Sequence, residues 1–246
     1  MTAPKPSLRV HDLTVGYAGG FSLAGLTFSA GPGDVVGLIG PNGAGKSTAL
    51  KALAGVLRPL SGEMRLGDRP LSPSETRLAF VPQREDVKWD FPATARDVVA
   101  MGTYRTRGWF RRIGRKERRS ADSALAELGL EGSGGHHISQ FSGGQQQRIF
   151  LARALVQQPD ILLLDEPYTG IDTGNRTVLR RLIAGFRERG VVTLMATHDL
   201  DEVRDRCTHV LCLNRRQVAF GPCEEAFTVD NLRATFGGSV AVFAEA

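Results

Sequence analysis

Short apolar and alternating runs divide this chain into segments with different predicted structures. Leu8–Val15 alternates between apolar and polar side chains, which is typical of a half-buried β-strand, and Phe21–Phe28 is a plausible second strand. Val35–Ile39, Ile161–Leu164 and Val191–Ala196 are short and continuously apolar. This second pattern favours strands of a parallel sheet that is covered on both faces.

Helical periodicity follows and joins these strands. Ser47–Ala54 comes after the Val35–Ile39 run through a glycine-rich loop, and Arg176–Arg189 connects two apolar runs as a crossover helix. From about residue 93 onward the pattern is helical, with few strand signals, until about residue 156. We therefore predict one domain over residues 1–246. Its α/β core comprises about residues 1–92 and 157–246, and a helical subdomain is inserted at about residues 93–156.

The composition is that of an ordinary globular protein. Of 246 residues, 41% are hydrophobic and 23% are charged, which argues against a chain that is disordered throughout. No run approaches the ~20 apolar residues that a membrane-spanning helix needs, and the N-terminus lacks a secretory signal. We expect a soluble cytoplasmic protein. The net charge of +5 is compatible with nucleic acid, an anionic membrane or phosphorylated ligands, and does not choose among them.

A phosphate-binding loop follows the third predicted strand. Residues 40–47 match the pattern G-x-x-x-x-G-K-[ST] in full. The glycines let successive backbone N–H groups point at phosphate oxygens, and the following helix adds its positive end. Lys46 is predicted to reach the β- and γ-phosphates, and Ser47 to ligate Mg²⁺. The predicted nucleotide-binding residues here are Gly40, Pro41, Asn42, Gly43, Ala44, Gly45, Lys46, Ser47 and Thr48.

Two carboxylates stand at the end of the apolar run Ile161–Leu164. The ends of such strands line the ligand crevice in α/β folds. Asp165 is placed to hold Mg²⁺, directly or through water, and Glu166 to orient and polarise an attacking water. Alone, this pair has an alternative interpretation as helix-capping acids in a solvated turn. Beside a complete phosphate loop, we interpret it as catalytic.

The segment Phe141-Ser142-Gly143-Gly144-Gln145 carries a family resemblance. It is similar to the Leu-Ser-Gly-Gly-Gln signature of the ATP-binding subunits of ATP-binding cassette (ABC) transporters, with Phe141 in place of leucine. The resemblance covers essentially the whole chain. It implies a P-loop NTPase core of the ABC ATPase type, with an N-terminal antiparallel β subdomain and an inserted helical subdomain.

The same resemblance implies roles for further residues, which occur in the expected order. Tyr17 corresponds to the aromatic residue that stacks on adenine. Gln83 corresponds to the loop glutamine that senses Mg²⁺ and touches the membrane subunit. Asp172, in Gly170-Ile171-Asp172, belongs to the loop that crosses the dimer contact. His198 corresponds to the switch histidine near the γ-phosphate, so Lys46, Glu166 and His198 form the implied catalytic set.

The resemblance also implies partners and a cycle. Family members hydrolyse ATP as a head-to-tail pair, in which Ser142, Gly143, Gly144 and Gln145 of one copy close over the γ-phosphate held by Lys46 of the other. ATP and Mg²⁺ are the implied cofactors. The motion would drive a separate integral-membrane permease, so we expect the protein to lie on the inner face of the plasma membrane. An extracytoplasmic metal-binding protein is an indirect partner, and no nucleic acid is expected.

Less specific segments point to a branch of the family. Trp89-Asp90-Phe91-Pro92, Asp97–Gly102, Gly108–Arg112, Gln145–Arg148 and Leu213–Arg216 together resemble importer subunits that serve manganese, zinc or iron. Importers of ferric siderophores or cobalamin share much of this pattern and remain an alternative. A non-transport ABC ATPase acting on ribosomes or DNA is the second alternative, although no second phosphate loop or long heptad pattern accompanies the first.

Three further features have ordinary explanations. His136 and His137 are adjacent on the chain, so their rings point in different directions, and we expect a surface or packing role for both. Cys207, Cys212 and Cys223 lack zinc-ribbon spacing and cannot all pair, so we expect free thiols. The basic run Arg105–Arg119 has no accompanying nucleic-acid motif, and we interpret it as a solvated face near the membrane.

Overall fold

Two β-sheets form the framework of the molecule. The computed structural model describes residues 5–17, 20, 22–87, 89–104, 113–169 and 173–237. The first sheet has the order β2-β1-β4-β5 and is antiparallel throughout. Its strands are β1 (Leu8–Gly16), β2 (Ser22–Ala30), β4 (Ser61–Leu66) and β5 (Arg69–Pro70). This sheet is the predicted antiparallel β subdomain.

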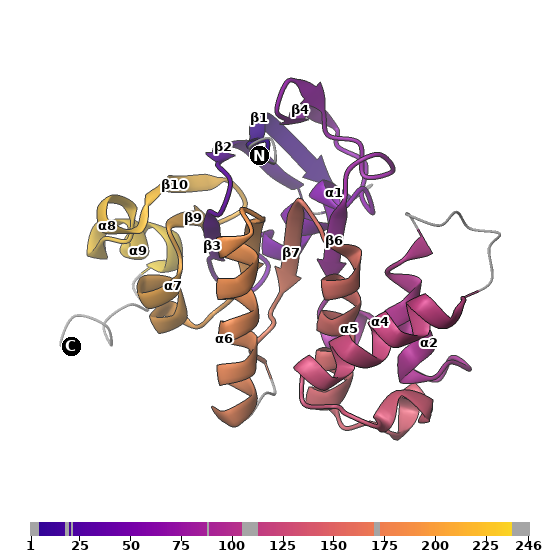
Figure 1. Cartoon of the computed structure of the whole chain (residues 1–246). Helices are drawn as coiled ribbons and strands as arrows, with labels where there is room; N and C mark the ends of the chain where they lie inside the picture. Colours follow the sequence, from indigo (N-terminus) through magenta and orange to yellow (C-terminus); the bar gives the residue numbers. More distant parts are fainter. Residues whose placement is uncertain are drawn as a thin grey trace.

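The second sheet carries the chemistry. Its order is β10-β9-β3-β8-β7-β6, and every neighbouring pair is parallel except β10 with β9. Its strands are β3 (Val35–Ile39), β6 (Leu78–Val81), β7 (Ile161–Asp165), β8 (Val192–Ala196), β9 (His209–Leu213) and β10 (Gln217–Pro222). Because five strands run in one direction, their carboxyl ends meet at one edge of the sheet (Figure 1).

Alternation along the buried strands separates two hydrophobic cores. Ile161 and Leu163 of β7 join a cluster with the first sheet and with α1 (Lys46–Leu53), which therefore packs between the two sheets. Leu162 and Leu164 point to the opposite face and join the cluster of the other helices. The second sheet is thus covered on both faces, as its continuous apolar strands predicted.

The remaining helices pack on the face of the second sheet opposite α1, or at the ends of its strands (Figure 1). Their bounds are α2 (Ala95–Met101), α4 (Arg115–Glu127), α5 (Gly143–Gln157), α6 (Thr173–Glu188), α7 (Leu200–Arg206), α8 (Cys223–Ala226) and α9 (Val229–Phe236). Three short 3₁₀ helices among the described residues are η1 (Arg84–Asp86), η2 (Ser133–Gly135) and η3 (Ile138–Gln140).

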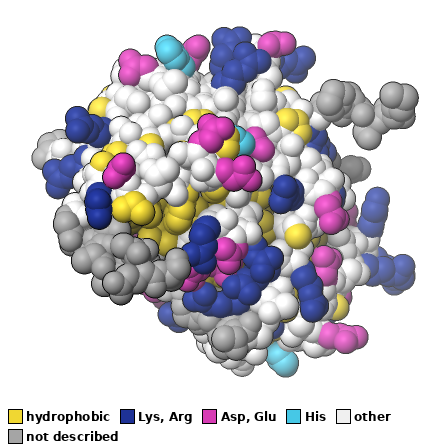
Figure 2. Space-filling model, turned by 90° about the vertical axis from the view of Figure 1, so that its left-hand side faces the viewer, with side chains coloured by type: hydrophobic (Ala, Val, Ile, Leu, Met, Phe, Trp, Pro, Cys, Tyr) yellow, Lys and Arg dark blue, Asp and Glu magenta, His cyan; other side chains and the backbone are white. Residues whose placement is uncertain are grey.

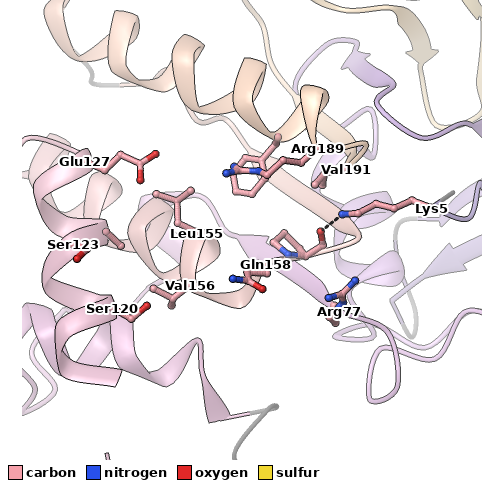
Figure 3. A pocket seen from close by; sticks show the side chains of 13 residues that line it. Lys5, Arg77, Ser120, Ser123, Glu127, Leu155, Val156, Gln158, Arg189 and Val191 are labelled. Atoms are coloured by element: carbon pink, nitrogen blue, oxygen red, sulfur yellow. Dashed lines mark hydrogen bonds between the residues drawn. The ribbon is translucent and has the colours of Figure 1, made fainter. Parts of the chain in front are cut away.

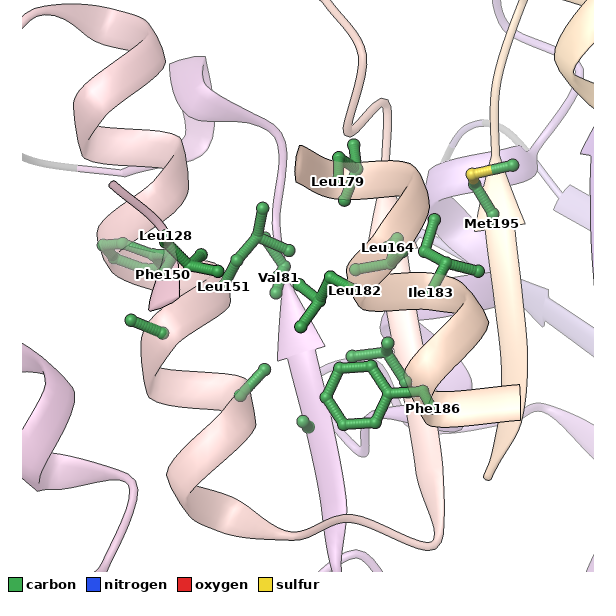
Figure 4. Close-up of a cluster of buried hydrophobic side chains, with 14 of the residues drawn as sticks. Val81, Leu128, Phe150, Leu151, Leu164, Leu179, Leu182, Ile183, Phe186 and Met195 are labelled. Carbon is green, nitrogen blue, oxygen red and sulfur yellow. The ribbon is translucent and has the colours of Figure 1, made fainter. Parts of the chain in front are cut away.

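Helix α5 joins the helical segment to the sheet. Its Phe150 and Leu151 belong to the same buried cluster as Val81 of β6 and Phe186 of α6 (Figure 4). The guanidinium of Arg153 donates a hydrogen bond to the Phe80 carbonyl at 2.9 Å. Apolar burial and this bond together fix α5 against the edge strand β6.

The surface around the helices is mixed in charge. Seen from the side that carries α8 and α9, basic and acidic side chains alternate around a hollow with a hydrophobic lining (Figure 2). Over the described residues, no helix is both long and apolar enough to span a membrane. The thiols of Cys207 and Cys212 are buried and that of Cys223 is half-buried, and all three are free, as their number and spacing predicted.

The predicted fold class is confirmed, and the five predicted strands occur within two residues of their expected bounds. Strands β4, β5, β6, β9 and β10 were not predicted, although β6 and residues 210–213 of β9 are apolar runs of the same kind as β3. Between residues 93 and 158, the described part of the chain holds helices and one isolated bridge from Thr94 to His137. The subdomain bounds themselves stay a prediction.

Candidate active site

The loop after β3 is shaped by glycines that no other residue can replace without strain. Gly43 and Gly45 have φ values of 77° and 107°. A Cβ atom on Gly40 would lie 2.0 Å from the Leu213 carbonyl oxygen at the end of β9. The loop is therefore held tightly against the neighbouring strand before it enters α1.

Lys46 is folded back onto the loop that precedes it. Its ammonium donates hydrogen bonds to the carbonyl oxygens of Gly40 at 2.8 Å and Pro41 at 3.2 Å. The residue is only 7% exposed, and burial lowers the pKa of the ammonium, against the opposing effect of Glu166 and Asp165. A cation is thus fixed at the mouth of a loop of backbone N–H groups.

Asp165 ends β7 beneath the first turn of α1. Ser47 Oγ donates a hydrogen bond to its Oδ1 at 2.9 Å, while its buried Oδ2 has no hydrogen-bond partner among the described residues. Burial raises the pKa of the Asp165 carboxyl to about 6, and the Ser47 bond works in the opposite direction. An orphaned carboxylate oxygen beside a hydroxyl is the donor set that Mg²⁺ prefers. These residues therefore fit the metal.

No group of three or more His, Cys, Asp or Glu side chains is arranged to hold a metal in the described parts of the chain. Mg²⁺ usually keeps several waters and takes one or two carboxylates together with substrate phosphates. The Ser47 and Asp165 pair matches that mode of binding.

Glu166 has a strained backbone and a partly exposed side chain. Its φ of 47° is unusual for a residue other than glycine, and it is held by a bond from its N–H to the Ala196 carbonyl at 3.0 Å. The side chain accepts a hydrogen bond from Thr169 Oγ1 at 3.0 Å. Its carboxylate is 17% exposed, so it can reach water in the cavity.

His198 follows the neighbouring strand β8. Its Nδ1 lies 3.6 Å from Glu166 Oε2, and its side chain is 65% exposed. Thr197 is fixed to β3 by a bond from its N–H to the Leu38 carbonyl at 3.1 Å. The ends of three adjacent strands therefore bring the loop lysine, the two acids and the histidine together.

A cavity of about 770 Å³ lies at this edge of the sheet. It is lined by Tyr17, Asn42, Gly43, Ala44, Gly45, Lys46, Ser47, Thr48, Gln83, Glu166 and His198. Gly40 and Pro41 contact Lys46 behind it, and Asp165 contacts Ser47. Tyr17 is 50% exposed, which leaves its ring open to a flat ligand. The structure thus gathers most of the residues predicted from the sequence.

The signature residues begin α5 and are not among the described residues that line this cavity. Ser142 is the N-cap, with its N–H donating to Gln145 Oε1 at 2.8 Å in a capping box. The first turn packs against Arg84, whose Nε donates to Gln146 Oε1 at 3.3 Å. Asp172 lies outside the described residues, as do residues 105–112, which hold half of the basic side chains of the basic run and the whole Gly108–Arg112 segment.

A second cavity, of about 540 Å³, lies at the opposite edge of the same sheet (Figure 3). Arg77, Pro159 and Val191 precede β6, β7 and β8, so this cavity is at the amino ends of the strands. Lys5 and Arg77 both form ion pairs with Asp160, which is not among the residues that line the cavity. None of the residues predicted to be functional lines it, and ligands of parallel α/β sheets bind at the carboxyl edge.

The remaining sequence expectations concern histidines. The His136 ring lies 6.2 Å from that of Phe141, and His137 Nδ1 contacts Ser139 Oγ at 2.7 Å in a 3₁₀ cap. These contacts agree with a surface and packing role. Thr169 contacts Glu166 directly and was missed, because a threonine three residues after an acid carries no recognisable sequence signal.

The chain is similar to known proteins in both sequence and fold. A family model described as "ABC transporter" matches residues 23–169. The chain is 37% identical to the manganese transport system ATP-binding protein MntB of Halalkalibacterium halodurans, over 98% of this chain and 96% of the relative. It is 42% identical to the zinc transport system ATP-binding protein TroB of Treponema pallidum, over 98% and 90%.

Solved structures give the same result. One is an inward-facing ABC transporter described as metal-chelate type, with a TM-score of 0.80 and 28% identity over 94% of this chain and 88% of the other. Another is a dimeric, post-hydrolysis ATP-binding cassette bound to ADP and Pi, with a TM-score of 0.78 and 25% identity over 87% and 98%. Both sequence and fold therefore agree over nearly the whole chain.

Proposed function

The chain belongs to the ABC transporter family as an ATP-hydrolysing subunit, and from that premise we propose its place in transport. It is the motor subunit of an importer for a divalent metal ion, with manganese first and zinc or iron next. One observation carries the proposal at the level of chemistry: Lys46, Ser47, Glu166 and His198 line one cavity at the carboxyl edge of the sheet.

The loop and Lys46 bind the phosphates of ATP. Backbone N–H groups of the loop and the start of α1 face the anion, and phosphate oxygens replace the two carbonyls that the Lys46 ammonium now contacts. Tyr17, half exposed at the cavity edge, stacks on the base. These contacts orient the γ-phosphate toward Glu166 and His198.

Ser47 and Asp165 hold Mg²⁺ together with the phosphates, and Gln83 at the cavity wall completes the set. The ion supplies positive charge that neutralises the β- and γ-phosphate oxygens. The buried Oδ2 of Asp165, which lacks a partner among the described residues, supports this role.

Glu166 orients the attacking water and accepts its proton. Its carboxylate is fixed on one oxygen by Thr169 and remains partly open to the cavity. His198, 3.6 Å from that carboxylate, stands where it can donate a hydrogen bond to the γ-phosphate. The strained backbone of Glu166 keeps the side chain at the edge of the sheet.

A second copy completes each site. Ser142, Gly143, Gly144 and Gln145 begin a helix outside the cavity of their own chain, so we assign them to the ATP held by the partner copy. The dimeric cassette bound to ADP and Pi, which this chain resembles, supports such a pair. Hydrolysis removes the γ-phosphate contacts and lets the copies separate.

The cargo is inferred from the relatives. Those named above are subunits of manganese and zinc transport systems, and another relative, 39% identical, belongs to a chelated iron transport system of Yersinia pestis. We propose that this chain lies on the inner face of the plasma membrane, bound to a separate permease. An extracytoplasmic metal-binding protein delivers the ion to that permease.

The first test is ATP turnover by the Glu166→Gln variant. Removing the base should leave ATP affinity within about twofold and lower kcat by roughly 100-fold or more. Glu131→Gln is the matched control, because Glu131 is exposed and is not among the described residues that line the cavity. Turnover near the wild-type rate in Glu166→Gln would overturn the assignment of the base.

The second test is cellular uptake of manganese, zinc and iron by strains carrying wild type, Glu166→Gln or Glu131→Gln. Loss of uptake of one metal in the Glu166→Gln strain alone would identify the cargo and the direction of transport. Unchanged uptake of all three metals would contradict the metal proposal and favour a chelate importer or a non-transport role.

A further inference from the structure

Two arginines on α6 face two acids on α7. Arg176 Nη1 donates to Asp199 Oδ2 at 2.8 Å, and one turn later Arg180 Nε donates to Glu202 Oε1 at 2.9 Å. The two helices lie next to each other (Figure 1). The first of these pairs has an unusual position, because Asp199 directly follows His198.

Asp199 connects Arg176 to the histidine loop. Its Oδ1 accepts a hydrogen bond from the Glu202 N–H at 3.2 Å and so caps the start of α7. Its own N–H donates to Thr197 Oγ1 at 3.0 Å across His198. Arg176 therefore holds the side chain of Asp199. Because Asp199 directly follows His198, its backbone position influences the direction of the His198 side chain.

The same arginine contacts the loop of the catalytic base. Its guanidinium carbon lies 5.7 Å from the centre of the Tyr168 ring, and Tyr168, two residues after Glu166, is only 4% exposed. Thr169, the next residue, donates the hydrogen bond to the Glu166 carboxylate. One side chain on α6 thus contacts both segments that carry reacting groups.

We propose that Arg176 is a positioning residue for ATP hydrolysis, which holds the His198 loop through Asp199 and the Glu166 loop through Tyr168. The inference rests on the roles proposed above for Glu166 and His198. The ends of the two strands are joined by the bond from the Glu166 N–H to the Ala196 carbonyl, and beyond it the Glu166 and His198 side chains approach each other to 3.6 Å. Because reaction rates are sensitive to displacements of about 1 Å, loosening this arginine should slow the chemical step rather than ATP binding.

The Arg180–Glu202 pair differs from the Arg176–Asp199 pair in burial. Glu202 is 2% exposed, so removal of Arg180 leaves a buried charge without its partner and should destabilise the fold itself. Arg176 is half-buried, and a cavity of about 170 Å³ adjoins both pairs. Replacement of Arg176 is therefore tolerated better and can be studied by kinetics.

The test compares the full-length variants Arg176→Met, Arg176→Lys and Arg204→Met with wild type. We expect Arg176→Met to lower kcat by about 10- to 100-fold with KM for ATP within about twofold. Arg176→Lys should recover most of the loss, since only one nitrogen of Arg176 contacts Asp199. Arg204 is exposed and pairs with the exposed Asp201 and Asp205 of α7, so Arg204→Met should turn over like wild type.

Asp199→Asn gives an independent result if Arg176→Met does not fold. Asparagine preserves the cap of α7 but loses the charge that Arg176 contacts, and kcat should fall as in Arg176→Met. Wild-type kcat in either folded variant, or an equal loss in Arg204→Met, would overturn the proposal. His198→Ala separates the two levels of inference: if it turns over normally, the proposed site fails, whereas slow His198→Ala with normal Arg176→Met refutes the positioning role alone.

Discussion

The buried charge of Asp165 lowers the stability of the ligand-free protein. Its pKa lies near 6 in the folded chain because of burial, against about 3.9 for an unperturbed Asp. The folded state therefore binds the proton more tightly than the unfolded state. The free energy of unfolding therefore falls by an amount on the order of 2–3 kcal/mol as the pH rises from about 4 to about 6, and it stays at the lower value above pH 6.

Asp165→Asn should remove this loss, since an amide oxygen can still accept the Ser47 hydrogen bond. We expect the variant without nucleotide to be more stable than wild type at pH 7.5 and nearly equal to it at pH 4. Urea denaturation across this pH range measures the difference. A variant that is equally stable or less stable at pH 7.5 would contradict the cost of burial, and the same variant should lose Mg²⁺-dependent turnover.

Gly40 and Gly43 differ in the space around them. A methyl group on Gly40 would collide with the Leu213 carbonyl, whereas no atom of the described residues lies within 4 Å of one on Gly43. We expect Gly40→Ala to cost more than about 3 kcal/mol and Gly43→Ala about 1–2 kcal/mol from its positive φ alone. Guanidinium denaturation of both variants, without nucleotide, provides the comparison, and equal losses would refute it.

At the scale of elements, the N-caps of α2 and α5 form a matched pair. Thr94 and Ser142 each accept a hydrogen bond from the N–H three residues on, within a capping box. Replacing either by Ala should cost about 1 kcal/mol of stability. Only Ser142→Ala should also slow ATP turnover, because only α5 is assigned to the partner's ATP. Denaturation midpoints and kcat for both variants test this, and an equal loss of kcat in Thr94→Ala would argue against the assignment.

At the scale of the whole molecule, two copies should associate only when ATP is trapped. Glu166→Gln with ATP and Mg²⁺ should double its mass in light scattering, since two ATP molecules bridge the copies in the proposed pair, and ADP should not have this effect. The control Glu131→Gln hydrolyses its ATP and should return to the starting mass. A Glu166→Gln protein that keeps the same mass with and without ATP would contradict the head-to-tail pair.

The same scale shows where sequence reasoning succeeded. Strands β3, β7 and β8 were predicted because each is buried on both faces and reads as an apolar run. In contrast, β4 and β10 are half exposed and have no such pattern. The phosphate loop and the acidic pair could be predicted from local chemistry. Arg176 could not, since its partner Asp199 is brought near only by the packing of α6 on α7.

The order of the second sheet has a consequence for the protein during its synthesis. The central strand β3 has β8 and β9 as neighbours, and these emerge from the ribosome roughly 150 residues later. At about 5–20 residues per second, a nascent chain carries this buried apolar strand without its partners for roughly 8 to 30 seconds. The antiparallel sheet and α1 are complete long before then. Translation speed through the helical segment therefore sets how long this apolar strand waits, and chaperones can bind it in that interval.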